Sequence, residues 1–376
     1  MVASDVTRAL QQLSVELREL EGSEVQRLAG PLTPLQFYRD FVGKNKPCLL
    51  AGAIESWPAL SLWNQQHLVE KLKNKQVTVA VTPNGRADAV CNIKAGQEPQ
   101  KQKPYFVLPF ERQMHMADFL KHLVHQQPSS QQQVPSLMEA GGNSKAQAEP
   151  ETMYLQQQNG NFTSHFPELL DDVDAELHWA SQAFGASPDA VNLWIGDDHS
   201  VTSFHKDHYE NIYAVVTGEK TFTLLPPCDA YRMHLAHYPT ATCCDTPQGL
   251  QVIPSPDSEQ VLWSPIEDLA SHDCSEEYKQ QYPAYFNPLL PKPFRVTVRA
   301  GEILYLPSLW WHQVEQTAGT DNMVIAVNYW YDMQFDCKYA YFQLVESLTR
   351  SIPLENGHIV NATNSDQHAA EHKLLT

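Results

Sequence analysis

The chain has 376 residues, of which 42% are hydrophobic, so it can bury the core of one large β domain with helical additions, or of two domains. It carries 44 acidic and 26 basic residues, and the resulting net charge of -18 repels phosphate backbones. We therefore expect no direct binding of nucleic acid.

The seven cysteines are scattered along the chain and include no Cys-x-x-Cys pair, a pattern that favours a reducing compartment over a disulfide framework. No stretch reaches the ~20 apolar residues that a membrane-spanning helix needs. The N-terminus alternates charged residues and leucines, unlike a secretory signal. From these three observations we expect a soluble intracellular protein with no membrane partner.

The first 90 residues are predicted to form helices and short strands that pack on a core, with 91–125 leading into that core. Leucines at helical spacing follow Ser4 and Asp5, and Thr33-Pro34 opens a second amphipathic segment. Two β-type runs come next, "KPCLLAG" and "QVTVAVT".

Residues 126–151 differ sharply in composition from what precedes them. The segment is rich in Gln, Ser, Pro and Gly and has almost nothing to bury, so burial cannot offset the entropy cost of ordering it. Three prolines and a Gly-Gly pair weaken the alternative, a polar helix. We predict a flexible surface loop.

Residues 152–336 contain a series of short β-branched and aromatic runs punctuated by Gly, Pro and Asn. Such a series is typical of a jelly roll or barrel. An amphipathic helix is predicted within 337–355, and 356–376 is predicted to be disordered. The fold class we expect is mainly β with flanking helices around a double-stranded β-helix, a cupin-like jelly roll.

The stretch "TSFHKDHYEN" places polar chemistry directly before an apolar run. In one extended strand His205 and Asp207 would share a face that Tyr209, Asn211 and Tyr213 continue, while Lys206 would point away. A single His-x-Asp is weak evidence, since a hydrogen-bonded patch on a sheet edge would look the same.

A third residue strengthens the pattern about a hundred positions later. His312 follows two tryptophans in "GEILYLPSLWWH", and a histidine on so aromatic a strand needs a polar partner or a metal. A buried histidine satisfied by a backbone carbonyl is the alternative. Together His205, Asp207 and His312 match the two-histidine, one-carboxylate set that leaves three positions open on non-haem Fe(II), whereas catalytic zinc typically keeps one.

Lys220 tests this interpretation independently. It shares a face with Phe222 and Leu224, and a lysine on an inward face needs an anion, which the distal carboxylate of 2-oxoglutarate would supply. The alternative is a solvated turn lysine beside Glu219.

Three segments, "VTSFHKDHYENIYAVVTGEKTF", "VRAGEILYLPSLWWHQVEQ" and "IAVNYWYDMQFDCKYAYFQL", closely resemble the Jumonji-C family of Fe(II)- and 2-oxoglutarate-dependent oxygenases. The resemblance implies His205, Asp207 and His312 as catalytic iron ligands, and Fe(II), 2-oxoglutarate and O2 as cofactors. It also implies that five residues contact 2-oxoglutarate: Lys220, Tyr154, Thr202, Asn211 and Asn328. Thr202 has the wrong parity for the His205 face, so its inward placement requires a bulge or a strand start.

The same resemblance implies a protein oxygenase that hydroxylates a lysine side chain at C-3 in a partner such as a developmentally regulated GTP-binding protein. The alternatives are a peptidase on basic or methylated histone tails, and a histone demethylase. It further implies a homodimer that resides in the cytoplasm and nucleus. A non-catalytic cupin-type binding module is disfavoured because His205, Asp207, His312 and Lys220 are all present.

Overall fold

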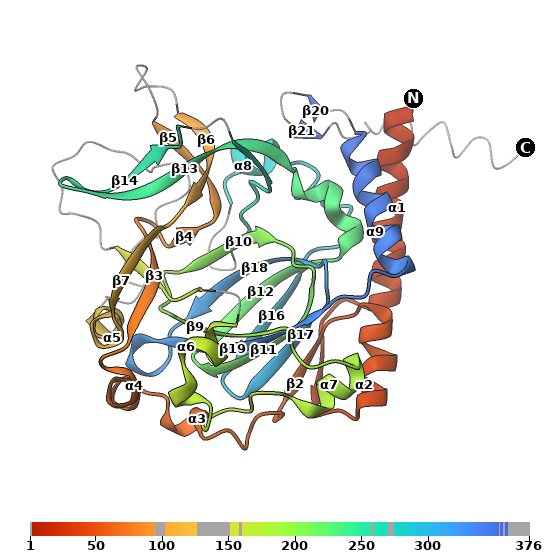
Figure 1. Ribbon diagram of the computed structural model, residues 1–376. Coiled ribbons are helices and arrows are strands. Elements are labelled where there is room, and N and C mark those ends of the chain that lie inside the picture. The colour runs from red at the N-terminus through yellow and green to blue at the C-terminus, as the bar shows by residue number, and fades with distance from the viewer. Residues whose placement is uncertain are drawn as a thin grey trace, which may run out of the picture.

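The structure is a computed structural model, and it describes residues 2–94, 102–125, 151–157, 160–256, 259–269, 274–352, 354–355 and 358–359. Two curled sheets form its centre (Figure 1). None of the helices in these ranges is long and apolar enough to cross a bilayer. The curled sheets have the jelly-roll, cupin-like arrangement, which confirms the predicted fold class.

The first central sheet has six strands, and the second has five. In both, neighbouring strands come from distant parts of the chain, as a jelly roll requires. The first sheet has the order β1 (Gln26–Ala29), β2 (Cys48–Ala51), β17 (Glu302–Leu306), β11 (Tyr209–Thr217), β19 (Val324–Asp332), β9 (Ala190–Gly196). The second has the order β16 (Phe294–Arg299), β12 (Glu219–Leu225), β18 (Trp311–Thr317), β10 (Val201–His205), β4 (Arg86–Ala87).

Successive side chains of β11 point to opposite faces of the first sheet and pack into two different hydrophobic clusters. Ile212, Ala214 and Val216 belong to the cluster outside the first sheet, whereas Tyr213 and Val215 face the space between the sheets. Both faces of the strand are therefore apolar, as expected for a strand covered on both sides.

Helices cover the outer face of the first sheet. Thr33 opens α2 with a capping box, in which its side chain accepts a hydrogen bond from the Gln36 backbone. Buried Phe37 of this helix packs edge-on against Tyr305 of β17, and the two ring centroids lie 4.9 Å apart. The helices contributing to this outer cluster are α2 (Pro34–Asp40), α3 (Ala59–Leu62), α4 (Gln65–Leu72), α5 (Met116–His125), α6 (Asn161–His165) and α7 (His178–Phe184). Short 3-10 turns at Val42–Lys44 and Pro167–Leu169 also contribute, and a further 3-10 turn lies at Thr320–Asn322.

Two smaller sheets extend the core on the side where the β5, β6, β13 and β14 ribbons project (Figure 1). The first has the order β14 (Gly249–Pro254), β13 (Ala236–Thr246), β6 (Gln102–Leu108), β5 (Ala89–Lys94), with β15 (Gln260–Trp263) also paired to β13. The second has the order β7 (Phe110–His115), β3 (Gln76–Thr82), β8 (Thr152–Tyr154).

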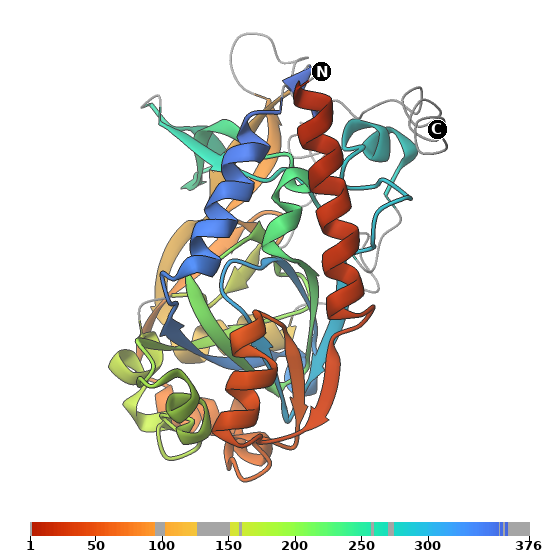
Figure 2. The ribbon, with the colours of Figure 1, turned by 90° about the vertical axis from the view of Figure 1, so that its right-hand side faces the viewer.

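The two ends of the chain meet in a helical pair. Helix α1 (Val2–Glu21) and helix α9 (Cys337–Arg350) run side by side along one flank of the jelly roll (Figures 1 and 2). Leu10 of α1 and Val345 of α9 share an apolar cluster with Tyr231, which lies in the 3-10 segment Pro227–Met233. Asp336 caps α9 by accepting hydrogen bonds from two backbone N–H groups of its first turn.

The predicted Gln-rich loop, apart from Glu151, lies outside the described residues. Of the predicted tail at 356–376, the structure describes His358–Ile359 (β21), which pairs with Leu354–Glu355 (β20). Helix α8 (Glu276–Gln281) completes the described helices.

Candidate active site

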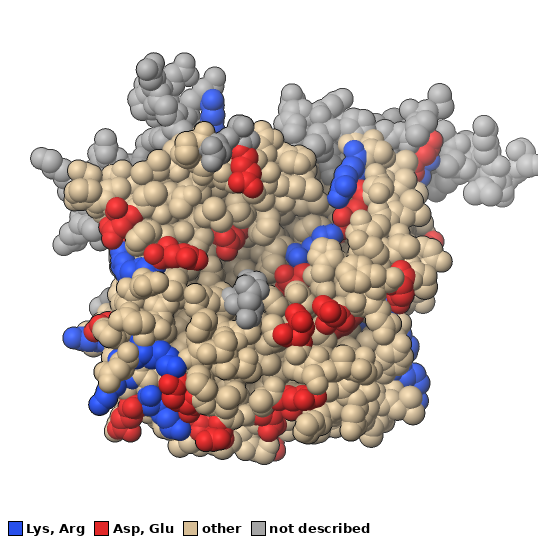
Figure 3. All heavy atoms as spheres, viewed as in Figure 1, with Lys and Arg blue, Asp and Glu red and all other residues tan. Residues whose placement is uncertain are grey.

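A cavity of about 320 Å³ opens between the two central sheets. Figure 3 shows the hollow near the middle of one face, with acidic residues on both sides of it. All eight residues that the sequence pattern and the resemblance single out line this cavity, and they come from six strands and the connection between β10 and β11: Tyr154, Thr202, His205, Asp207, Asn211, Lys220, His312 and Asn328.

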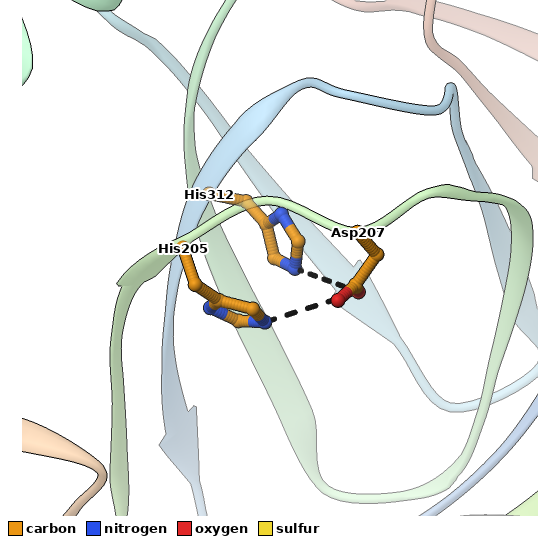
Figure 4. A group of neighbouring side chains, drawn as sticks. All are labelled: His205, Asp207 and His312. Atoms are coloured by element: carbon orange, nitrogen blue, oxygen red, sulfur yellow. Dashed lines mark ion pairs between the residues drawn. The ribbon is translucent and has the colours of Figure 1, made fainter. Parts of the chain in front are cut away.

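His205, Asp207 and His312 point toward one another in this cavity (Figure 4). His205 ends β10, Asp207 lies just beyond it, and His312 on β18 is the register partner of His205. An oxygen of Asp207 lies 3.9 Å from Nε2 of His205 and 3.7 Å from Nε2 of His312. The three potential ligand atoms are thus close enough to hold one metal ion.

Backbone carbonyls fix which ring nitrogen of each histidine faces the cavity. Nδ1 of His205 donates to the Ser203 carbonyl at 2.8 Å, and Nδ1 of His312 donates to the Trp310 carbonyl at 3.0 Å. A carbonyl can only accept, so each Nδ1 carries a hydrogen, and Nε2 is the nitrogen of each ring left to bind a ligand. In both residues Nε2 is also the ring nitrogen that lies within 4 Å of Asp207.

Burial keeps His312 neutral. Its side chain is buried, and desolvation, reinforced by the nearby His205, lowers its pKa to about 4. A neutral imidazole is the form that binds a metal. Two histidines and one aspartate on one side of an open cavity fit Fe(II), because this donor set leaves positions free for further ligands.

The connection between the first two of these residues differs from the sequence-based interpretation. His205 and Asp207 were expected on one continuous strand with Tyr209, Asn211 and Tyr213. Instead β10 ends at His205 in the second sheet, and β11 begins at Tyr209 in the first sheet. Asp207 therefore reaches the cavity from the crossover between the sheets rather than by strand alternation.

Thr202 reaches the cavity through an irregularity in β10. The register of β10 against β18 shifts between Thr202 and His205, so the two residues are not held to simple alternation. This shift is the bulge that the parity of Thr202 required. Its side chain lines the cavity beside Ser203 and His205.

Lys220 of β12 closes the inner end of the cavity. Its side chain is 1% exposed, and its ammonium donates to the Tyr154 hydroxyl at 3.0 Å and to Oε1 of Gln316 at 2.6 Å. Both partners are neutral, and burial lowers the pKa of Lys220 to about 7. A carboxylate bound here would restore the charged form, so the inner end fits an anionic ligand.

The close packing around Lys220 depends on one glycine. A Cβ on Gly196 would lie 2.5 Å from the Tyr154 ring and 3.0 Å from Nε2 of Gln316. A larger residue would push both groups away from Lys220. The requirement here is for space, which only glycine leaves.

Asn211 and Asn328 form a chain of buried amides along the cavity wall. Asn328 donates to Oδ1 of Asn211 at 3.0 Å, and Oδ1 of Asn328 accepts from Asn192 and from the Trp194 indole. Every link is a donor–acceptor pair, so the orientation of each amide is set by its neighbour.

Four polar residues at this site escaped the sequence analysis: Asp88, Gln156 and Ser203 line the cavity, and Gln316 accepts a hydrogen bond from Lys220 beside it. Gln316 follows His312 and Val314 at alternate positions of β18, so strand parity could have placed it on the face of His312. Asp88 has no such signal, because it reaches the cavity through the pairing of β4 with β10.

Lys206, which lies between His205 and Asp207, points away from the cavity, as expected. The Lys206 ammonium forms an ion pair with the carboxylate of Glu346 on α9 and lies 5.2 Å from the centre of the Trp311 ring. Burial lowers the pKa of Lys206 to about 8, with a further contribution from Arg350. The terminal helix is thereby attached directly to the ligand segment.

Comparison with known proteins places the chain in a family. The Cupin-like domain family matches residues 34–337. The chain is 40% identical over 348 residues to the lysine-specific demethylase JMJ32 of Arabidopsis thaliana, a match covering 91% of this chain and 92% of the relative. It is 39% identical over 356 residues to the bifunctional peptidase and (3S)-lysyl hydroxylase JMJD7 of Homo sapiens, covering 92% and 99% respectively.

A third relative extends the comparison to a slime mould. The JmjC domain-containing protein E of Dictyostelium discoideum is 33% identical over 339 residues, covering 87% of this chain and 89% of the relative. These three matches cover most of this chain and most of each relative. The chain belongs to the cupin-like JmjC family of 2-oxoglutarate-dependent oxygenases and is an enzyme.

Proposed function

We propose that His205, Asp207 and His312 hold Fe(II) and that Lys220 pairs with the distal carboxylate of 2-oxoglutarate in the same cavity. The observation that carries this proposal is the arrangement of charge. One end of the cavity has two histidines beside an aspartate, and the other end has a buried ammonium with neutral partners. Those ends complement a divalent cation and a dianion.

The remaining cavity residues would orient the co-substrate. The Tyr154 hydroxyl accepts from Lys220 and can donate to the same carboxylate, and Thr202 offers a second hydroxyl. Asn211 and Asn328 would fix the position of its other end, because their amides are already held in one orientation. Fixed donors cost no reorganisation when the ligand binds.

The protein would position the reactants and shield them. Fe(II), 2-oxoglutarate and O2 together supply the oxidation that places one oxygen atom on a C–H bond of the substrate and yields succinate and CO2. Phe222 and Val314 line the cavity between the two ends, so little water can compete there.

For the substrate we propose a lysine side chain, oxidised at C-3, in a partner protein such as a developmentally regulated GTP-binding protein. The human relative that matches over 99% of its length is named a (3S)-lysyl hydroxylase. The net charge of -18 also favours a partner that presents lysines.

Incubation with Fe(II), 2-oxoglutarate, O2 and a lysine-containing segment of such a GTP-binding protein tests the proposal. Intact lysine residues should gain the mass of one oxygen, and succinate should form in step. New peptide termini that appear without 2-oxoglutarate, and that are lost with Asp207→Ala, would establish the peptidase alternative instead.

Two alternatives keep support from the relatives' names. The human relative is also named a peptidase, and the Arabidopsis relative is named a lysine-specific demethylase. A basic or methylated histone tail would be the substrate of either. Hydroxylation is favoured over hydrolysis because hydrolysis does not use a carboxylate-binding ammonium at Lys220. Loss of a methyl group as formaldehyde from a methylated histone tail would instead identify a demethylase.

We also propose that the enzyme is a homodimer that pairs through α9. Tyr341, Leu344 and Leu348 leave apolar surface on this helix, and Phe335 continues it just before the helix begins. A patch of this kind on one helix is typical of an interface. Leu344→Glu should convert the dimer to a monomer in light scattering, and a wild-type monomer would contradict the proposal.

For the location in the cell we propose cytoplasm and nucleus. All seven cysteines are free, including the adjacent Cys243 and Cys244, as is typical of a reducing compartment. Imaging of the tagged full-length chain tests this, and accumulation in the secretory pathway would contradict it.

A further inference from the structure

The cavity holds one charged side chain that the proposed chemistry does not use. Besides the two histidines, the cavity lining includes three acidic or basic side chains, those of Asp207, Lys220 and Asp88. Asp207 belongs to the proposed metal site, and Lys220 faces the proposed co-substrate. Asp88 is left as a carboxylate in the same cavity with no assigned partner from the reaction.

The position of Asp88 is fixed by its backbone. It follows β4, which pairs with β10, the strand that ends at His205. Its φ of 52° lies in the left-handed region, which Asp and Asn adopt more readily than most residues. Its carbonyl accepts from Ser203 Oγ at 2.6 Å, and Ser203 Oγ in turn accepts from the Trp263 indole at 3.1 Å. The carboxylate is therefore presented from a rigid turn.

The Asp88 carboxylate is poorly satisfied within the protein. Its side chain accepts from Nε2 of Gln156 at 3.5 Å, the outer limit of a hydrogen bond. Among the described residues, no lysine or arginine forms an ion pair with it. Burial raises its pKa, which shows that the carboxylate loses more hydration than its neighbours replace. A cationic group on a bound ligand would supply the missing ion pair.

Aromatic rings line the approach to this carboxylate. The rings of Phe106 and Trp263 lie 4.8 Å apart, and the Trp263 ring is parallel to the His205 imidazole with centroids 6.4 Å apart. All three residues line the cavity with Asp88. Apolar walls that end at a carboxylate match a side chain with a methylene stem and a cationic tip, which is the chemistry of lysine.

We infer that Asp88 determines substrate specificity by receiving the ε-ammonium of the substrate lysine while its methylene stem lies along Phe106 and Trp263. This inference rests on the proposed lysyl hydroxylase function and names the residue that selects lysine. The tip of the side chain is held at Asp88, so the carbon that faces His205, Asp207 and His312 is set by the length of the stem.

The test measures binding separately from turnover. Two nonapeptide pools with randomised flanks carry lysine or norleucine, its uncharged analogue, at the centre. Binding to the full-length enzyme with Fe(II) and 2-oxoglutarate is followed without O2 by the fluorescence of the cavity tryptophans. Wild type should bind the lysine pool at least about 30-fold more tightly, the lower range for an unpaired buried charge.

Asp88→Asn should reduce that preference to near unity while leaving 2-oxoglutarate affinity unchanged. Asn suits the same backbone conformation, so the variant should fold. Glu24→Gln is the matched control, because it removes the same charge from an exposed position outside the cavity. It should keep the wild-type preference.

Two results would overturn the inference: no lysine preference in wild type, or an undiminished preference in Asp88→Asn. Admitting O2 then tests the proposed function by itself. A lysine preference that depends on Asp88, without oxygen added to lysine, would contradict hydroxylation while supporting Asp88 as the ammonium site. Hydroxylation that Asp88→Asn leaves intact, with unchanged binding, would contradict Asp88 and support hydroxylation.

Discussion

Two groups of three potential metal ligands lie within the described residues, and only the first has the features of a working site. The first is His205, Asp207 and His312, and the second is the consecutive run Asp197, Asp198 and His199 at the end of β9. Both groups bring their ligand atoms within 4.8 Å of one another. Proximity alone therefore does not separate them.

They differ in what holds the histidines. In the first group each Nδ1 donates to a backbone carbonyl outside the group, so Nε2 is the ring nitrogen that faces Asp207. In the second, Nδ1 of His199 lies 3.3 Å from Asp197 and 3.2 Å from Asp198, and its hydrogen bond to Asp197 raises its pKa. The second group therefore favours the charged form of its histidine, which cannot ligate a metal. In the first group both rings are held by carbonyls from outside the group.

The largest expected effect separates the two groups directly. Asp207→Ala removes the carboxylate of the first group and should reduce 2-oxoglutarate turnover at least about a hundredfold, since loss of a ligand exceeds the ~10- to 100-fold cost typical of its supporting partners. Asp198→Ala is the matched control and should keep turnover within a few-fold. Succinate formation measures both.

Wild-type turnover by Asp207→Ala would show that the metal binds elsewhere. Loss of turnover in Asp198→Ala, with its thermal melting temperature unchanged, would give the second group a role that its geometry does not indicate.

The second prediction concerns the ion at the far end of the cavity. Lys220→Ala should weaken 2-oxoglutarate binding by ~2–5 kcal/mol, because the distal carboxylate would lose its buried partner. Metal affinity should change little, since Lys220 contacts Tyr154 and Gln316 rather than the ligands. Calorimetry with Mn(II) in place of Fe(II) measures both constants. The exposed Lys103→Ala is the control, and equal losses in the two variants would indicate a general charge effect.

The third prediction is a pH dependence with a definite sign. The pKa of Lys220 in the free protein is lowered to about 7, and a bound carboxylate would raise it. Below about pH 7 the ammonium is already charged, so affinity for 2-oxoglutarate should be at its plateau. Above that pH binding must take up a proton, so affinity should fall by up to ~10-fold per pH unit. Lys220→Ala should abolish this slope, and a flat wild-type profile would contradict the assignment.

The jelly roll could be predicted because alternation and turn residues mark short strands, and Lys220 could be predicted because Phe222 and Leu224 fix its face. The route of Asp207 could not, because the crossover at Lys206–His208 looks like continued alternation in the sequence. Asp88 could not either. Its position depends on strand pairing between segments more than a hundred residues apart, which leaves no local pattern.

The smallest expected effect concerns the ion pair between Lys206 and helix α9, and it tests whether this pair supports metal binding by the first group. Glu346 of α9 pairs with Lys206, the residue between His205 and Asp207. Glu346→Gln should weaken Mn(II) binding by about 10-fold, at the low end for a supporting partner, because the ligand segment loses one anchor. Lys206→Met should weaken it similarly, and the double variant should lose no more than either single one. Glu19→Gln on α1, exposed and equal in charge change, should bind as wild type. Additive losses in the double variant would mean that the two residues act separately, and that α9 does not support the metal ligands through this pair.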